Sequence, residues 1–310
     1  MGSGPGRSDP ARGAASTAEA SRPAASSLWP RTLILLAAVL FSTGGTAIKS
    51  CEFSGVQVAC LRSGIAALVL IAFLPGLRLQ LKWRSCLVAL AFAVTMLLFV
   101  LANKRTTAAH TIFLQSTAPL YILLLAPLLL RERAQRAELL TLPLLAGGLF
   151  LLLFAGQAPQ ASAPQPFEGN LLAMSAGPSW ALTILGLRFL SRGAEPGNPG
   201  LGAVVLGNAL ACLFTLPFAW PFAGAGAADW LGACYLGVFQ IGVAYLCLTK
   251  GIGRVPAFEA ALLLMVEPVL NPLWSFLVHG ERLAGLAVLG GLLVLLATLG
   301  RALLQRRVGT

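Results

Sequence analysis

The sequence predicts an all-α integral membrane protein with ten transmembrane helices arranged as two inverted five-helix repeats. Three observations predict this fold class. The 310 residues are 57% hydrophobic and only 11% charged, with a mean hydropathy of +0.82, whereas soluble domains carry about a quarter charged residues. The chain also contains ten long apolar windows, and a pattern in the fourth window returns in the ninth. This composition excludes an ordinary water-soluble enzyme.

The ten apolar windows match the length of spanning helices. A span needs roughly 20 mostly apolar residues, because the hydrocarbon core is about 30 Å thick and each helical residue rises about 1.5 Å. The apolar runs are continuous rather than alternating, which argues against the strands of about 9 to 11 residues found in membrane barrels. The predicted spans are 32–48, 56–74, 85–103, 108–130, 139–156, 169–190, 201–220, 230–249, 257–278 and 284–304.

Polar residues are confined to the two ends and to short connections. Residues 1–28 are rich in Ala, Ser, Gly and Pro and are expected to form a disordered cytoplasmic tail. A transit peptide is the alternative, but no amphipathic helix is evident there. No cleavable signal is expected, so the first helix should stay as an anchor. The predicted segments are a tail at 1–28, repeats at 29–157 and 168–304, and a cytoplasmic tail at 305–310.

The net charge of +11 indicates orientation rather than nucleic-acid binding. In membrane proteins Lys and Arg accumulate in cytoplasmic loops. With the N-terminus in the cytoplasm, 17 of the 22 basic residues fall on that side and four on the other, namely Lys49, Lys104, Arg105 and Arg282, while Arg62 lies inside the second span. This bias predicts a multi-pass protein of the cell (inner) membrane with both termini cytoplasmic.

An internal repeat links the two halves of the chain. Leu114–Tyr121 (LQSTAPLY) followed by Glu132 is echoed by Leu263–Leu270 (LLMVEPVL) followed by Glu281. In both copies a proline, Pro119 or Pro268, precedes the acid by 13 residues and falls in the middle of a predicted span. The offset of 149 covers five spans, so the second copy is inverted relative to the first. Inverted repeats are typical of secondary transporters, whose substrate site lies near the midplane.

These residues resemble the EamA-type transporters of the drug/metabolite transporter superfamily over about residues 32–304. The similarity lies in the Arg62-containing second span (VACLRSGIAAL), in Ala118–Leu120 with Arg131–Arg133, and above all in Val266–Val269 (VEPV) with Gly280–Leu283 (GERL). The sequence departs from the family pattern at Arg131, where a Gly is common, and at Thr141 and Pro143 in the fifth helix. The resemblance implies two inverted five-helix halves, a cavity lined by helices 1, 3, 4, 6, 8 and 9, and movement of small metabolites such as amino acids, frequently export.

Polar groups inside the spans are the candidate substrate contacts, because a charge near the bilayer centre is costly and normally faces protein or water. Glu267 lies near the middle of span nine beside Pro268, and Asn271 is on the same helical face. Arg62 is the basic residue inside a span. For Glu267 and Arg62 a fixed packing role competes with substrate contact, and Arg62, Pro119 and Pro268 are assigned as structural or gating residues.

Other candidates are uncharged or aromatic. The predicted substrate-binding set is completed by Gln115, Gln240, Trp180, Ser42, Thr43, Phe99, Phe239 and Tyr245. For each of these, helix–helix contact is the competing interpretation. Glu259 and His110 lie at the ends of spans nine and four and could take part in proton coupling, although such residues are more often solvated.

The common sequence motifs of enzymes and cofactor sites are absent from the sequence. The sequence holds no phosphate-binding loop, nucleophile elbow, zinc-binding helix or dinucleotide fingerprint. Six scattered cysteines and two histidines support neither a disulfide framework nor a metal site. We therefore expect a secondary transporter without a cofactor. Its partners would be a small-molecule substrate and the bilayer, with a homodimer left open and no nucleic acid. The alternative is an intramembrane enzyme or a non-transporting membrane component.

Overall fold

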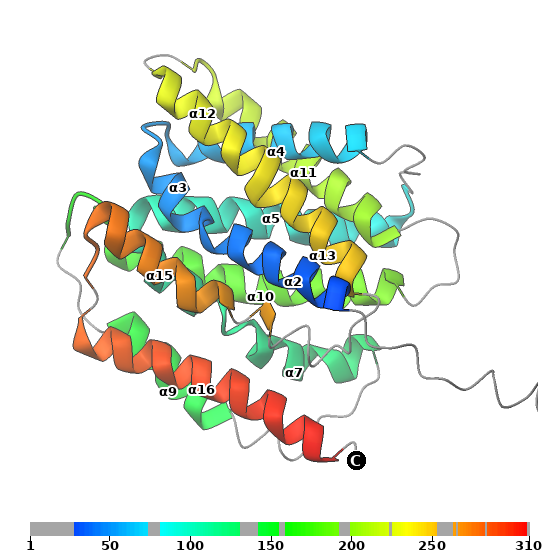
Figure 1. Cartoon of the computed structure of the whole chain (residues 1–310), viewed down its shortest axis with the longest axis vertical. Coiled ribbons are helices and arrows are strands. Elements are labelled where there is room, and N and C mark those ends of the chain that lie inside the picture. The colour runs from blue at the N-terminus through cyan, green and yellow to red at the C-terminus, as the bar shows by residue number, and fades with distance from the viewer. Residues whose placement is uncertain are drawn as a thin grey trace, which may run out of the picture.

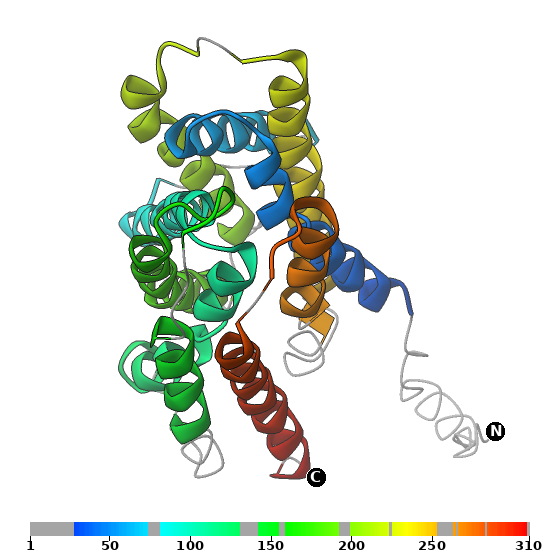
Figure 2. The same ribbon diagram turned by 90° about the vertical axis from the view of Figure 1, so that its left-hand side faces the viewer.

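The structure is a computed structural model that describes residues 28–73, 81–130, 142–154, 159–191, 199–222, 225–252, 263–264, 266–282 and 284–308. These residues form a bundle of helices. The helix near the N-terminus, Leu28–Ser42, runs beside Ala244–Ile252, and the C-terminal helix, Gly285–Val308, runs beside Leu142–Phe154 (Figures 1 and 2). Within the described ranges the β-type pairing is an isolated bridge between Gln160 and Ala163. The expected all-helical class is therefore confirmed for the described part of the chain.

The helices follow the apolar windows in order. They are α2 (Leu28–Ser42), α3 (Gly44–Ser50), α4 (Gly55–Phe73), α5 (Trp83–Arg105), α6 (Ala108–Gln115), α7 (Ala118–Leu130), α9 (Leu142–Phe154), α10 (Pro166–Ser191), α11 (Pro199–Ala219), α12 (Ala227–Tyr235), the π-helix η2 (Leu236–Val243), α13 (Ala244–Ile252), α15 (Val266–His279) and α16 (Gly285–Val308).

Each of the ten predicted windows contains at least one described helix. Six helical stretches in the described residues are long and apolar enough to cross a membrane: Leu28–Ser50, Gly55–Phe73, Trp83–Arg105, Pro166–Leu187, Pro199–Ala219 and Ala227–Gly251. In the fourth, fifth, ninth and tenth windows, the described helical residues are not both long enough and apolar enough to count as a membrane span. The count of ten spans remains a prediction.

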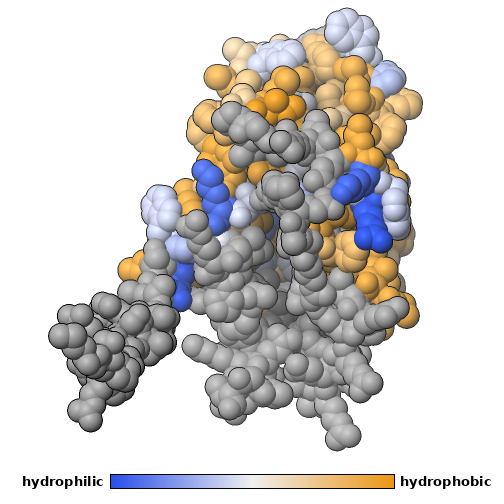
Figure 3. All heavy atoms as spheres, turned by 90° about the vertical axis from the view of Figure 1, so that its right-hand side faces the viewer, coloured by the Kyte–Doolittle hydropathy of each residue, from blue (hydrophilic) through white to orange (hydrophobic). Residues whose placement is uncertain are grey.

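The outside of the bundle is apolar. Large side chains such as Phe218 and Leu128 are 79% and 78% exposed, and apolar residues cover most of the described surface in Figure 3. Exposed apolar surface on this scale is costly in water and is the normal condition of a lipid-facing surface. The lipid of a bilayer would therefore surround these apolar side chains, which a soluble protein would bury.

Small residues let the helices approach closely inside the bundle. A Cβ on Gly148 of α9 would lie 2.8 Å from the carbonyl oxygen of Gly290 on α16, and a Cβ on Gly290 would lie 2.9 Å from the carbonyl oxygen of Gly148. The two backbones meet in a reciprocal contact (Figure 1). Close glycine contacts of this kind are a main source of helix association in membranes.

The first and fourth windows are each broken at a Ser–Thr pair. The hydroxyls of Ser42 and Thr43 donate to the carbonyl oxygens of Val39 and Leu40, each at 2.7 Å, and α3 begins at Gly44. Such side-chain bonds compete with the helical ladder and favour a break. The first span is therefore one apolar stretch, Leu28–Ser50, made of the two helices α2 and α3.

The fourth window repeats this arrangement. Ser116 donates to the carbonyl oxygen of Ile112 at 2.7 Å, and Thr117 donates to that of Leu114. α6 ends at Gln115 and α7 starts at Ala118, so the prediction of one helix over 108–130 was wrong. Pro119, the second residue of α7, has no N–H to continue the helix across this point.

The two prolines of the repeat differ in how their helices are described. Pro119 is the second residue of α7, where the missing N–H has no partner to lose within α7, so the expectation that it falls in mid-helix is corrected. Pro268 is the third described residue of α15; residues 263–264 before it are also helical, and residue 265 lies outside the described residues. The expectation that Pro268 falls in mid-helix therefore stays a prediction.

Candidate functional site

Three side-chain amides converge on the break in the first span. A Cβ built on Gly45 would lie 3.0 Å from Oδ1 of Asn103 on α5 and 3.1 Å from Nδ2 of Asn271 on α15. A Cβ on Gly44 would lie 2.7 Å from Nε2 of Gln240 on η2. Only glycines leave room for these amides, which we call the amide cluster: Asn103, Gln240 and Asn271.

The amide cluster is buried and incompletely hydrogen-bonded. Asn103 and Asn271 are fully buried and Gln240 is 3% exposed. Asn103 Nδ2 donates to the carbonyl oxygen of Phe99 at 2.9 Å. Among the described residues, however, Asn103 Oδ1, Gln240 Oε1 and both polar atoms of Asn271 have no partner. An unmet buried polar group costs about 1–3 kcal/mol, so a ligand that bonds these atoms removes that cost.

The backbone around the amide cluster is interrupted on two elements. Gly44 and Gly45 open α3, and Gln240 lies on a π-helix rather than an α-helix. π-Helical turns are rare and are often found at functional sites. η2 packs closely on α4, since a Cβ on Gly237 would lie 2.5 Å from Cβ of Ile65. The amide cluster thus lies where regular helices give way, as in the discontinuous helices of transporters.

Hydroxyl and aromatic groups surround the break. Ser42 Oγ accepts a hydrogen bond from Nε1 of Trp274 at 3.0 Å. The hydroxyls of Thr43 and Tyr235 are 2.8 Å apart, and Tyr235 stacks on Phe239 with ring centroids 5.9 Å apart. Phe239 is 49% exposed, so it flanks the break from the outside rather than lining a closed core.

Polar residues recur at every fourth position of α15, which places them on one helical face. Three of them lie against α3: Asn271 is next to Gly45, Ser275 Oγ is 3.0 Å from Thr46 Oγ1, and His279 Nε2 is 3.1 Å from the carbonyl oxygen of Thr46. We call this face the polar seam: Glu267, Asn271, Ser275 and His279. It runs from the amide cluster to one end of the bundle.

Arg62 is buried against α5. It is 1% exposed, and its Nη2 donates to the carbonyl oxygen and the Sδ of Met96 at 3.2 and 3.4 Å. Within the described ranges no ion pair joins Arg62 to Glu267, although Tyr245 lies within electrostatic range of both. Tyr245 is itself buried between Phe41 and Phe92 at centroid distances of 5.1 and 5.4 Å.

The other predicted residues lie apart from the amide cluster or outside the described residues. Gln115 ends α6, two turns beyond Ala108, and its Oε1 is buried without a partner among the described residues. Trp180 is half-buried on α10, and Phe99 is in the main apolar core. His110 is fully buried, contrary to the expectation of a solvated residue, and its Nδ1 is 2.8 Å from the Thr107 hydroxyl. Glu259 lies outside the described residues.

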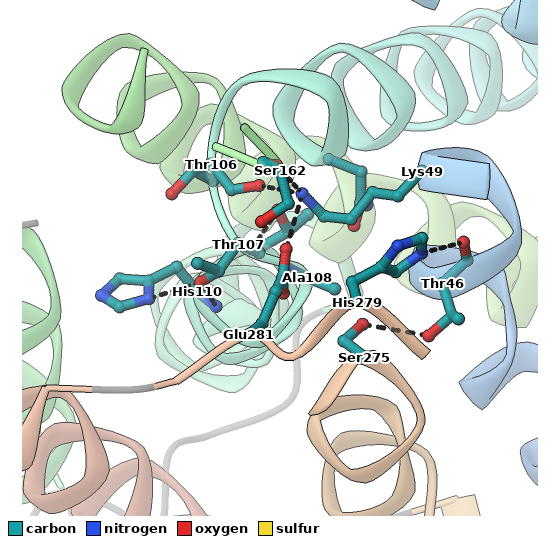
Figure 4. A network of polar contacts seen from close by, with 12 residues as sticks. Thr46, Lys49, Thr106, Thr107, Ala108, His110, Ser162, Ser275, His279 and Glu281 are labelled. Atoms are coloured by element: carbon teal, nitrogen blue, oxygen red, sulfur yellow. Dashed lines mark hydrogen bonds and ion pairs between the residues drawn. The ribbon is translucent and has the colours of Figure 1, made fainter. Parts of the chain in front are cut away.

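A buried ion pair lies at the end of the bundle where α3 and α15 end and α6 begins, which we call the α3 end. Lys49 Nζ is 2.9 Å from Glu281 Oε1, and both side chains are 3% exposed. Figure 4 shows the two side chains pointing toward each other among Thr106, Ala108 and Ser162. Sequence reasoning counted Lys49 as a loop charge and Glu281 as a family marker, and it missed this pair.

Asn103 was also missed. It is the last residue of the third predicted span, 85–103, and is followed by Lys104 and Arg105. Its position four residues after Phe99, within α5, is the signal that could have found it. The described residues contain no group of three or more His, Cys, Asp or Glu side chains able to hold a metal ion.

An all-helical bundle with a lipid-facing surface, interrupted helices and unpartnered interior amides defines a multi-pass membrane protein of the transporter class. The chain belongs to the EamA-like transporter family, which it matches over residues 28–154 and 167–301. The family expected from the sequence is therefore confirmed. Membership of this family implies that the chain lies in a lipid bilayer and acts on a small-molecule substrate.

Individual relatives agree with this class. The chain is 26% identical over 292 residues to the threonine/homoserine exporter RhtA of Escherichia coli K12, covering 90% of this chain and 94% of RhtA. It is 27% identical over 275 residues to an uncharacterized transporter of Archaeoglobus fulgidus, covering 86% and 93%. A solved crystal structure at 20% identity superposes with a TM-score of 0.62 over 91% of this chain and 99% of the other, which shows the fold. These relatives are named as transporters, which points away from an enzyme.

Proposed function

We propose that the chain is a secondary transporter that exports small polar organic metabolites, of the size and chemistry of amino acids, across the cell (inner) membrane. The observation that carries the proposal is the amide cluster at the Gly44–Gly45 break, whose buried polar atoms lack partners among the described residues. Amide groups can both donate and accept hydrogen bonds. They therefore suit a ligand that carries ammonium, carboxylate and hydroxyl groups together.

Threonine and homoserine are the first solutes to test. RhtA, which matches over 90% of this chain, is named as an exporter of these two amino acids. Both carry a hydroxyl in addition to the amino-acid ends, and uncharged amides can bind such a group. Because the identity is 26%, the proposal extends to other small amino acids and their relatives.

The expected mechanism is alternating access between two inverted five-helix halves. The internal repeat, the reciprocal contact of Gly148 and Gly290, and the Ser–Thr breaks in the first and fourth windows support it. Transporters of this kind rock one part against another around a fixed midplane site. The charge bias supports both termini in the cytoplasm and the α3 end on the opposite face.

Reconstitution tests the proposal directly. The purified full chain is placed in liposomes loaded with radiolabelled threonine or homoserine, and loss of label is compared with empty liposomes and with liposomes of an Asn103→Ala, Asn271→Ala double variant. We expect release above the empty-liposome rate for the parent chain and near that rate for the double variant. Asn208 offers the matched control, because it is a buried amide on α11 that donates to the carbonyl oxygen of its own helix, as Asn103 does.

A broad amino-acid and metabolite panel in which no solute crosses faster than in empty liposomes would overturn the proposal. An Asn208→Ala chain that loses transport as fully as the double variant would overturn the assignment of the amide cluster as the binding site, because the loss would then come from helix packing. Comparing metabolite pools inside and outside cells with and without the gene gives the direction.

A further inference from the structure

We propose that Glu281 is a latch that ties together two half-helices, α3 and α6, and thereby holds the α3 end of the transporter closed above the amide cluster. The inference rests on the proposed transport function and adds positioning residues to it. Neither Lys49 nor Glu281 touches the amide cluster, so both act through the helices that they join.

One carboxylate contacts both half-helices. Glu281 Oε1 pairs with Lys49 Nζ at 2.9 Å, and Lys49 is the residue before the end of α3. Glu281 Oε2 accepts a hydrogen bond at 3.0 Å from the backbone N–H of Ala108, the first residue of α6. A carboxylate is favoured at a helix N-terminus because it meets unpaired N–H groups and the positive end of the helix dipole. Glu281 therefore restrains α3 and α6 simultaneously.

Each half-helix extends from a break to this latch. α3 starts at Gly44, directly after the Ser42–Thr43 pair, and α6 ends at Gln115, directly before the Ser116–Thr117 pair. α3 has seven residues and α6 has eight, which corresponds to roughly 10–12 Å of helix. Each half-helix is thus bounded by a Ser–Thr break at one terminus and is held by Glu281 at the other, at the α3 end.

The interface beside the latch is polar and can exchange its partners for water. The polar seam of α15 meets α3 through Ser275 and Thr46, through His279 and the Thr46 carbonyl, and through Ser50 and His279 at 3.4 Å. Water can replace each of these hydrogen bonds at little net cost. An apolar interface would lose contacts on opening that water does not replace.

The buried charges give the latch two states. In the closed state both side chains are 3% exposed. Lys49 Nζ also donates to the carbonyl oxygens of Thr106 and Ser162, and Glu281 accepts from the Ala108 N–H, but the opposite charge within the pair comes from the other member. In an open state water solvates both charges and offsets the lost pairing. Removing one partner leaves a buried charge without compensation and therefore favours the open state.

Cysteine accessibility tests the latch without a substrate. In a chain whose six native cysteines are replaced by Ala, Ser275→Cys serves as reporter, since Ser275 is fully buried against Thr46 and the change is nearly isosteric. We expect a membrane-impermeant maleimide to label it at least tenfold faster in Glu281→Gln and in Lys49→Met than in the parent. Gln keeps an acceptor for the Ala108 N–H, so the first variant removes only the charge. Labelling is measured from both sides of the membrane and should be faster from the side away from the termini.

The matched control is a second pair at the same end. Arg105 Nε is 3.7 Å from Glu168 Oε2, with side chains 36% and 61% exposed, and the pair joins neither half-helix. Glu168→Gln should change the labelling rate by less than twofold. The double variant Lys49→Met, Glu281→Gln should label no faster than the faster single variant, because both changes break one contact.

Several outcomes overturn the latch: unchanged labelling in both single variants, equal acceleration in Glu168→Gln, or additive acceleration in the double variant. Thr46→Cys, on the opposite side of the same contact, is the second reporter if Ser275→Cys fails to fold. The outcomes for latch and function are separable. A chain that transports amino acids with unchanged labelling contradicts the latch alone, and a chain that labels as expected but moves no solute contradicts the proposed function alone.

Discussion

Asn103 and Asn271 come from α5 and α15 and face the same point on Gly45, each about 3 Å from the position that a Cβ there would occupy. The two residues are far apart in the sequence. Each has at least one polar side-chain atom without a hydrogen-bond partner among the described residues. A glycine, two amides and a helix break thus meet at one point, where three buried polar atoms lack a partner among the described residues.

Asn271→Ala should weaken substrate binding. Both polar atoms of Asn271 are free of protein partners in the described residues, so the change removes hydrogen bonds to the substrate without breaking any in the protein. A loss of about 1–3 kcal/mol of binding free energy raises KM by roughly 5- to 150-fold. Uptake kinetics in proteoliposomes measure it. A KM within twofold of the parent, or a loss matched by Asn208→Ala, would contradict a binding role.

Gly45→Ala should abolish transport while leaving the protein folded. The added methyl would lie 2.8 Å from Cβ of Ala108 and about 3 Å from the two amides, which have to move away. Gly285→Ala is the control, since no atom lies within 4 Å of a Cβ there. Transport and detergent-solubilised gel-filtration profiles should be recorded together. Parent-like transport by Gly45→Ala would show that the amides do not need this space.

Thr43→Val should lower the transport rate. The nearly isosteric change removes the hydroxyl that donates to the Leu40 carbonyl and meets the Tyr235 hydroxyl, each bond being worth about 1 kcal/mol. The break would then be less favoured relative to continuous helix. We expect a several-fold fall in maximal rate with little change in KM, measured as initial rates over a substrate series. A changed KM at constant rate would instead assign Thr43 to the substrate.

Gly148→Val should destabilise the bundle. Its Cβ would lie 2.8 Å from the Gly290 carbonyl oxygen and from Cγ2 of Val294, and overpacking of this kind costs about 1–3 kcal/mol. The neighbouring Gly147→Val is the matched control, because a Cβ on Gly147 has no atom within 4 Å. Thermal unfolding in detergent compares the two. Equal melting temperatures would mean that α9 and α16 can separate without cost.

The sequence predicted the helices well because apolar length alone requires them in a bilayer. It did not predict where helices break. Ser42, Thr43, Ser116 and Thr117 lie within apolar windows, and hydropathy registers hydroxyls only as slightly less apolar residues. The decisive information is the direction of each hydroxyl toward a carbonyl three or four residues earlier. That direction is set by the fold.

The site was predicted in part for a similar reason. Gln240 and Asn271 stand out as amides in apolar surroundings, and the structure brings both to the break at Gly44 and Gly45. Asn103 has the same chemistry, but two basic neighbours make it look like the start of a loop. The Lys49–Glu281 pair could not be inferred, since it joins residues from opposite ends of the chain. Long-range pairing of this kind needs either a structure or covariation.

The two helix breaks differ in what they allow. At Ser42–Thr43 every backbone N–H is still present, and only hydroxyl bonds to Val39 and Leu40 compete with the helical ladder. If the hydroxyls release these carbonyls, α2 and α3 can join into one straight rod. At Ser116–Thr117 the following Pro119 lacks a backbone N–H, and its ring crowds the carbonyl four residues earlier. A helix joined across this point would keep a kink, whereas α2 and α3 can join without one. The first span can therefore straighten at its break and the fourth cannot, which gives the two segments different ranges of motion around the same substrate.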